Sequence, residues 1–150
     1  MLRCLLLISA LYALPALACA DDPCQVMARY LARGMEVLAD ASIPGGDEHD
    51  GMIVLRDLRL DDAQVAETRA DLTKAGRPLI IGAVDPARTL ALLQRATQHA
   101  APGAGRIVVY AGMADGWPAA RTAMQRVGAI PLFADTAIAP REPLDLNCSQ

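Results

Sequence analysis

The sequence has very little lysine and few aromatic residues. Of its 14 basic residues Lys74 alone is a lysine, and 3% of its 150 residues are aromatic. A net charge of −3 leaves no basic surface of the size that nucleic-acid binding needs, so we expect no nucleic-acid partner. An apolar content of 53% excludes a disordered chain, and the length fits one domain with its own core.

Motifs that carry cofactor or catalytic chemistry are also missing. Neither G-x-G-x-x-G nor G-x-x-x-x-G-K-[ST] occurs, which argues against a nucleotide site. No serine lies in a G-x-S-x-G turn, no Cys-x-x-Cys pair is present, and His49 and His99 are the only imidazoles. We therefore expect no catalytic residue, no cofactor and no bound metal.

The first 20 residues have the features of an export signal. Arg3 supplies the positive start, Leu5 to Leu14 an apolar stretch, and Ala18-Cys19-Ala20 the small residues that a signal peptidase recognises. The stretch is too short to span a bilayer. We expect residues 1–20 to be a signal peptide and 21–150 to be a single domain without a membrane span. The protein would then be periplasmic or secreted, and the short signal and arginine-rich composition favour a bacterial source.

The cysteine positions add a disulfide to this expectation. Cleavage after Ala20 leaves Cys24 and Cys148, an even pair in an oxidising compartment where pairing is expected. A bond between them would staple the start of the mature chain to its end. The alternative is cleavage before Cys19 and a lipid anchor on that residue, although Ala16-Leu17-Ala18-Cys19 matches a lipoprotein signal poorly.

Apolar segments of two kinds alternate between these cysteines. Short runs rich in β-branched residues are typical of buried strands, and longer amphipathic segments are typical of helices. Such alternation indicates parallel strands joined by crossover helices. We expect an α/β fold: a small three-layer domain with about four parallel strands and alternating helices, preceded by a helix and closed by the terminal disulfide. The expected helices are 24–40, 61–75 (ended by Gly76), 86–100 and 118–127; the expected strands are 52–55, 79–81, 107–110 and 129–133; the irregular tail is 135–150.

Two of the expected strands lead into loops of similar design. Gly82 and Gly112 lie 30 residues apart, and so do Asp85 and Asp115, each followed by a proline. Glycine permits a sharp exit from a strand, aspartate caps the next helix, and proline suits its first turn. A purely structural role therefore explains both loops.

A functional interpretation of these loops rests on their place in the fold. Ligands of open parallel sheets bind at the carboxyl ends of the strands. The candidate binding residues there are Asp57, Gly82, Asp85, Gly112, Asp115 and Trp117, with Asp135 after the last strand. Such an acidic edge suits a divalent cation or a cationic partner. Trp117 is the residue we expect to be least needed for packing.

One further segment combines possible metal ligands. Residues 45–51 (GGDEHDG) contain three carboxylates and His49. Their spacing differs from that of a calcium loop, and a catalytic zinc site needs three well-placed ligands. We interpret the segment as a solvated linker.

Two functions of different classes fit these observations. The first is a non-enzymatic protein-binding module of the cell envelope, such as an inhibitor, an immunity factor or an accessory factor, whose partner is another envelope or secreted protein. The alternative is a small hydrolase or metal-dependent enzyme that uses the acidic strand ends. Loss of an activity on replacing Asp85 and Asp115, without loss of folding, would favour the enzyme.

Overall fold

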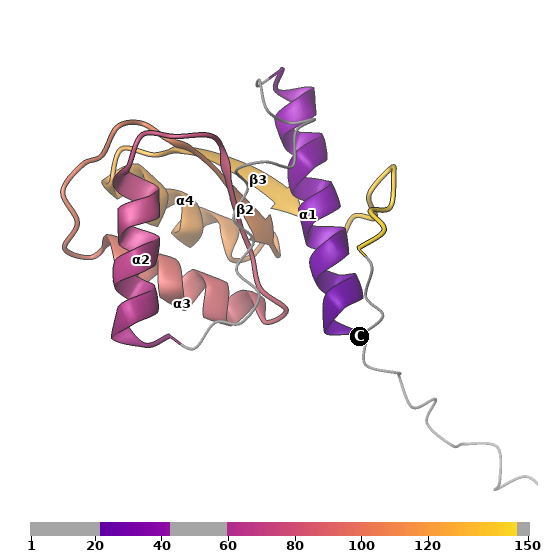
Figure 1. Cartoon of the computed structure of the whole chain (residues 1–150), viewed down its shortest axis with the longest axis horizontal. Helices are drawn as coiled ribbons and strands as arrows, with labels where there is room; N and C mark the ends of the chain where they lie inside the picture. Colours follow the sequence, from indigo (N-terminus) through magenta and orange to yellow (C-terminus); the bar gives the residue numbers. More distant parts are fainter. Residues whose placement is uncertain (1–21, 43–59, 147–150) are drawn as a thin grey trace, which may run out of the picture.

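The computed structural model describes residues 22–42 and 60–146 (Figure 1). None of the helices in these two ranges is long and apolar enough to cross a membrane. The predicted signal peptide, strand 52–55, segment 45–51, Asp57 and Cys148 lie outside the described residues. The described elements are α1 (Pro23–Asp40), α2 (Asp62–Thr73), β1 (Leu79–Ile81), α3 (Pro86–Thr97), β2 (Ile107–Gly112), α4 (Trp117–Arg126) and β3 (Ile130–Asp135).

The three strands in this part of the chain form one parallel sheet in the order β1-β2-β3. Ile81 pairs with Tyr110, and Gly112 at the end of β2 pairs with Asp135 at the end of β3. The predicted α/β fold with a parallel sheet is confirmed. Because the strands are parallel, the loops that follow them lie at one edge of the sheet.

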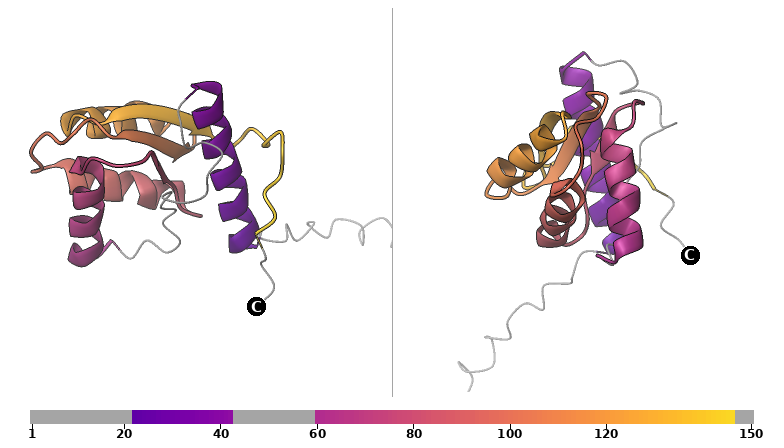
Figure 2. Two further views of the ribbon diagram at one scale, coloured as in Figure 1. Left: turned by 45° about the horizontal axis from the view of Figure 1, so that its top comes forward. Right: turned by 90° about the vertical axis from the view of Figure 1, so that its left-hand side faces the viewer.

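Different helices cover the two faces of the sheet. Val108 and Tyr110 of β2 belong to a core that α3 and α4 share, whereas Val109 and Ala111 face α1. This alternation is the period-two pattern of a strand buried on both faces. The helix α1 crosses the strands rather than running along them (Figure 1), and α2 packs against α3 at a steep angle (Figure 2).

A glycine allows α1 to approach the sheet closely. Gly34 lies inside the helix, where glycine is unfavourable by about 0.5–1 kcal/mol relative to alanine. A Cβ atom at this position would stand 2.7 Å from Cδ1 and 2.8 Å from Cγ2 of Ile80. Gly34, which weakens the helix locally, therefore lies at the contact point between α1 and β1.

Aspartates start three of the four helices in the described ranges. Their carboxylates accept backbone N–H groups at 2.8–3.0 Å, which satisfies donors that the first turn leaves unpaired. The pairs are Asp22 with Cys24, Asp61 with Gln64, and Asp85 with Ala87. The prediction that Gly76 ends α2 is wrong. The helix ends at Thr73, and Lys74 takes the cap position, where its N–H donates to the Ala70 carbonyl.

A buried arginine holds the loop between α2 and β1. The Arg106 side chain, 7% exposed, donates from Nε to the Arg77 carbonyl and from Nη1 to the Asp71 carbonyl, both at 2.7 Å. The Asp71 carboxylate lies 3.9 Å away and partly balances the charge. Because its polar atoms meet backbone acceptors, the burial of this guanidinium serves the fold.

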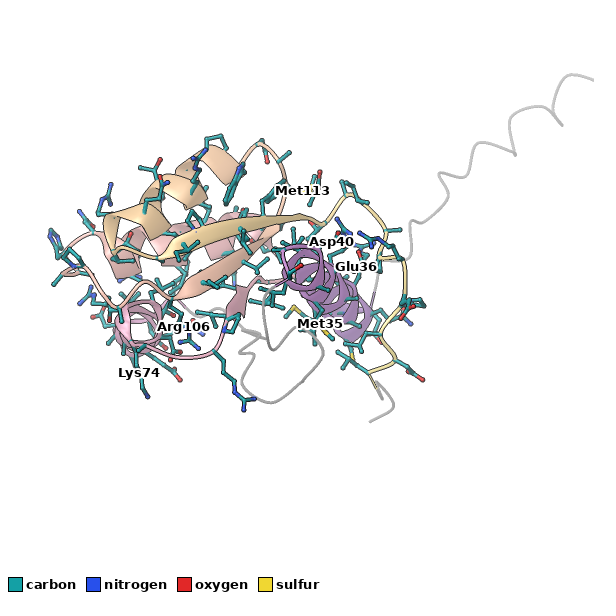
Figure 3. The ribbon with its side chains drawn as sticks, turned by 90° about the horizontal axis from the view of Figure 1, so that it is seen from above. Met35, Glu36, Asp40, Lys74, Arg106 and Met113 are labelled. Atoms are coloured by element: carbon teal, nitrogen blue, oxygen red, sulfur yellow. The ribbon has the colours of Figure 1, made fainter. Side chains whose placement is uncertain are left out.

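The chain after β3 is irregular through residue 146, and ion pairs attach it to α1. Glu36 accepts from the backbone N–H of Arg141 and pairs with Arg33, and the Arg141 guanidinium pairs with Asp40. Arg33 also donates to the Asp135 carbonyl at 3.4 Å. Figure 3 shows Glu36 and Asp40 on the side of α1 that faces this tail.

Candidate functional site

The loops after β1, β2 and β3 form the edge of the sheet at which a site was expected. The structure brings Gly82, Asp85, Gly112, Asp115 and Trp117 to this edge, because each lies at or just beyond the end of a parallel strand. Asp57 lies outside the described residues. Figure 3 shows Met113, from the loop after β2, far from Lys74 and Arg106 at the other end of the strands.

Asp85 has a structural role. Its carboxylate accepts the Ala87 N–H at 3.0 Å and lies 3.5 Å from the Arg88 guanidinium. The side chain is 55% exposed. The predicted cap is confirmed at this loop, and it occupies much of the hydrogen-bonding capacity of the carboxylate.

Asp115 does not repeat this arrangement, although the sequence predicts that it does. The cap position of α4 belongs to Gly116, which has no side chain to accept a bond. Asp115 is exposed and makes no hydrogen bond or ion pair within the described residues. Two loops of similar sequence therefore differ in chemistry, because Asp85 directly precedes its proline whereas two residues separate Asp115 from Pro118, so the cap position of α4 falls on Gly116.

Close packing, rather than a sharp exit from the strands, explains the two strand-end glycines. A Cβ on Gly82 would stand 3.1 Å from the Ala111 carbonyl oxygen and 3.3 Å from Cδ2 of Tyr30. A Cβ on Gly112 would stand 2.5 Å from the Tyr110 hydroxyl. Gly82 thus makes room for Ala111 of β2 and the Tyr30 ring, and Gly112 makes room for the Tyr110 ring.

Tyr110 is a site residue that the sequence analysis did not select. It is 1% exposed, and its hydroxyl lies between Gly112 and Gly116, with no hydrogen-bond partner among the described residues. Burial, the negative charge of Asp115 and the nearby Tyr30 raise the pKa of the Tyr110 hydroxyl. The unusual glycine content of the loop GMADG was the only sequence signal for it.

Trp117 packs more than expected. Its ring stacks on Phe133 at a centroid distance of 5.2 Å, and Phe133 lies 6.3 Å from the ring of Tyr110. Trp117 is partly buried against the α3–α4 core. The prediction that it is the residue least needed for packing is wrong, because it closes the end of that core.

Each strand of the sheet is followed by an exposed apolar side chain. Val84 after β1, Met113 after β2 and Ile138 after β3 are 41%, 44% and 52% exposed. The Thr136 hydroxyl contacts the Met113 sulfur at 3.8 Å, which joins the second and third loops. We call Val84, Asp85, Met113, Asp115 and Ile138 the strand-end surface.

The strand-end surface offers little to an anion or a metal. In α3 the Asp85 cap accepts one of the first N–H groups, and in α4 Trp117 N donates to Ala114 and Pro118 has no N–H. A phosphate would find few free donors there. Among the residues that the structure describes, no three His, Cys, Asp or Glu side chains are grouped to hold a metal.

No known family model, curated protein or solved structure matches this chain.

Proposed function

We propose that the protein is a non-enzymatic protein-binding module of the cell envelope, periplasmic or secreted, which binds another envelope or secreted protein through the strand-end surface. One observation carries this proposal. Each of the three described strands is followed within three residues by an exposed apolar side chain, Val84, Met113 or Ile138, in the loops at one edge of the sheet. Exposed apolar groups gathered in one place mark interaction sites, whereas isolated ones are ordinary.

The chemistry of the edge favours binding over catalysis. Asp85 caps α3, and the Asp135 carboxylate accepts the Ala137 N–H at 2.9 Å. Only Asp115 is left without such a role in the described loops, and a single carboxylate does not supply the acid–base pair of a hydrolase. Within the described loops, the enzyme alternative therefore rests on Asp115.

The rest of the proposal concerns the complete mature domain. It includes a signal peptide over 1–20, a fourth strand over 52–55 that completes a three-layer domain, and a disulfide between Cys24 and Cys148. Support for the disulfide comes from the tail, whose last described part passes beside the N-terminal half of α1, where Cys24 lies (Figures 1 and 2). A lipid anchor on Cys19 is the alternative to simple cleavage.

The test replaces the apolar part of the strand-end surface. The protein is cross-linked in its own cell envelope, and a stoichiometric partner is identified by mass spectrometry. The double variant Val84→Ser, Met113→Ser should lose this partner. The matched control is Ile130→Ser, because Ile130 is 53% exposed at the opposite end of β3. Retention of the partner by the double variant, or its loss in the control alone, would show that this surface does not bind it.

A further inference from the structure

The end of β2 and the loop before α4 carry two polar groups without a bonding partner in the described chain, the Asp115 carboxylate and the Tyr110 hydroxyl. Asp115 is exposed and has no cap or ion pair in the described part of the chain. Tyr110 is 1% exposed, and its hydroxyl points at the backbone of this loop. This hydroxyl has no hydrogen-bond partner in the described chain and is not fully enclosed, so water or a ligand group can reach it.

Two glycines allow the Tyr110 hydroxyl to lie against the backbone of this loop. Cβ atoms on Gly112 and Gly116 would stand 2.5 Å and 2.7 Å from the Tyr110 oxygen, so any other residue at either position would collide with it. Asp115 lies between the two glycines in sequence. The end of β2 and this loop therefore carry two oxygen acceptors, a charged one on Asp115 and a neutral one on Tyr110.

From this arrangement we infer that the strand-end surface receives a cationic side chain, arginine or lysine, from a protein segment that carries apolar residues on either side of it. The cation would donate to the Asp115 carboxylate and the Tyr110 hydroxyl oxygen, while its apolar neighbours would cover Met113 and Val84. This inference rests on the proposed function, because it names the chemistry of the partner that the surface binds.

Charge and exposure support this occupant over others. An anionic ligand would meet the charge of Asp115 and helix ends with few free N–H groups. A purely apolar ligand would leave a carboxylate and a hydroxyl unpaired under it, which costs binding free energy. A cation between apolar side chains satisfies both requirements. The effect of Asp115 on the pKa of Tyr110 shows that the two groups share one electrostatic environment.

The experiment uses a peptide of the inferred chemistry. Acetyl-Leu-Arg-Leu-amide is titrated into the isotope-labelled protein, and the amide signals of Met113 and Gly116 are followed by NMR. We expect saturable shifts with a Kd on the order of millimolar, as a short ligand with few contacts allows. The same peptide with citrulline in place of arginine keeps the shape without the charge and should bind at least about tenfold more weakly.

Variants of the chain identify the acceptors. Asp115→Asn should weaken the arginine peptide about tenfold, and Tyr110→Phe about threefold, as loss of a charged and a neutral hydrogen bond predict. Glu67→Gln, which removes the charge of an exposed carboxylate on α2 outside this surface, is the matched control and should bind the peptide as the unchanged protein does. The inference is overturned if citrulline and arginine peptides bind alike, or if Asp115→Asn has no effect.

The outcomes also separate this inference from the proposed function. If the Val84→Ser, Met113→Ser variant loses the envelope partner while Asp115→Asn keeps both partner and peptide, the surface binds protein but does not select a cation. If the peptide binds in an Asp115-dependent manner and no envelope partner depends on the surface, the cation site stands and the proposed function falls.

Discussion

The hydroxyl oxygen of Tyr110 lies 2.7 Å from the point at which a Cβ atom on Gly116 would stand, and the next nearest atoms are 3.6 Å away. The obstacle to a larger residue at position 116 is thus a single oxygen atom. Gly116 has φ −78° and ψ −17°, which alanine adopts without strain. Gly116→Ala should cost about 1–3 kcal/mol of unfolding free energy, as overpacking does.

The Tyr110→Phe variant removes that oxygen and should restore most of this stability. We expect the cost of Gly116→Ala to fall below about 1 kcal/mol when it is made in the Tyr110→Phe background, measured by urea unfolding of the unchanged protein, both single variants and the double variant. Gly112→Ala is the control, because Cε1 of Tyr110, 2.6 Å from its Cβ position, remains in phenylalanine. Equal costs of Gly116→Ala in both backgrounds would contradict this packing.

Gly34→Ala should destabilise the protein even though alanine favours helices. The added methyl would meet Cδ1 and Cγ2 of Ile80 at 2.7 Å and 2.8 Å. A repulsion of about 1–3 kcal/mol exceeds the helix gain of about 0.5–1 kcal/mol. In an Ile80→Ala background the same change should become neutral or stabilising, and thermal unfolding checks it. Additive effects of the two substitutions would show that α1 does not rest on Ile80.

Arg106→Ala should remove the attachment of α2, and of the loop that follows it, to the start of β2. The substitution leaves the Arg77 and Asp71 carbonyls without their buried donor, which should cost about 2–4 kcal/mol in urea unfolding. Arg106→Lys should recover part of this loss at most, because one ammonium group does not reproduce the planar guanidinium. Arg126→Ala, an exposed change in α4, should stay within about 0.5 kcal/mol.

Asp85 and Asp115 should differ in their effect on stability. Asp85→Ala removes a helix cap and should cost about 1 kcal/mol. Asp115→Ala removes a side chain without a bond in the described chain and should change stability by less than about 0.5 kcal/mol. Chemical denaturation of both variants measures the difference. Equal losses would mean that Asp115 caps α4 in solution.

Acid should loosen the tail from α1 through Glu36. Burial opposes ionisation of this carboxyl, but hydrogen bonds from the Arg141 N–H and from Arg33 outweigh it, so the pKa of Glu36 is lowered. A lowered pKa in the folded state gives a stabilisation that is complete above the unfolded pKa of about 4.3. It disappears as the pH falls through the lower folded value.

Comparison with Glu36→Gln isolates this contribution. The unchanged protein should be the more stable one at about pH 6, and the difference should shrink toward about pH 3, where the carboxyl is increasingly protonated. Urea unfolding at both pH values measures it. A difference that is the same at both would show that the Glu36 charge does not hold the tail.

The sequence predicts the elements of this fold better than its site. Apolar runs at 79–81 and 107–110 identify strands because both faces of the sheet are covered, and Pro86 and Pro118 mark helix starts. Strand order does not follow from such local patterns, because it depends on contacts between segments far apart in the chain.

The site was less predictable for a similar reason. The sequence places Gly82 and Gly112 at the strand ends, but the atoms that require glycine there belong to residues that a local pattern does not reveal: Ala111 and Tyr30 at Gly82, and Tyr110 at Gly112. Val84 and Met113 are exposed because of how the other segments of the chain pack around them. Such packing depends on the tertiary fold, and a local sequence pattern does not reveal it. Asp85 and Asp115 lie in loops of similar sequence, but only Asp85 caps the next helix, because it directly precedes the proline and Asp115 does not.

The outer edge of β3 has consequences for self-association. The N–H groups of Ile130 and Thr136 donate to the carbonyls of Arg106 and Gly112. The backbone N–H and C=O groups of Ile130 and of every second residue after it therefore point toward β2, and those of the residues between them point outward. Among these, Pro131 has no N–H to offer, and the Asp135 carbonyl already accepts from Arg33. An incoming strand would find both a donor and an acceptor only at Phe133. The described sheet therefore resists strand swapping and fibrous aggregation along this edge, which would suit a protein that folds after export as proposed.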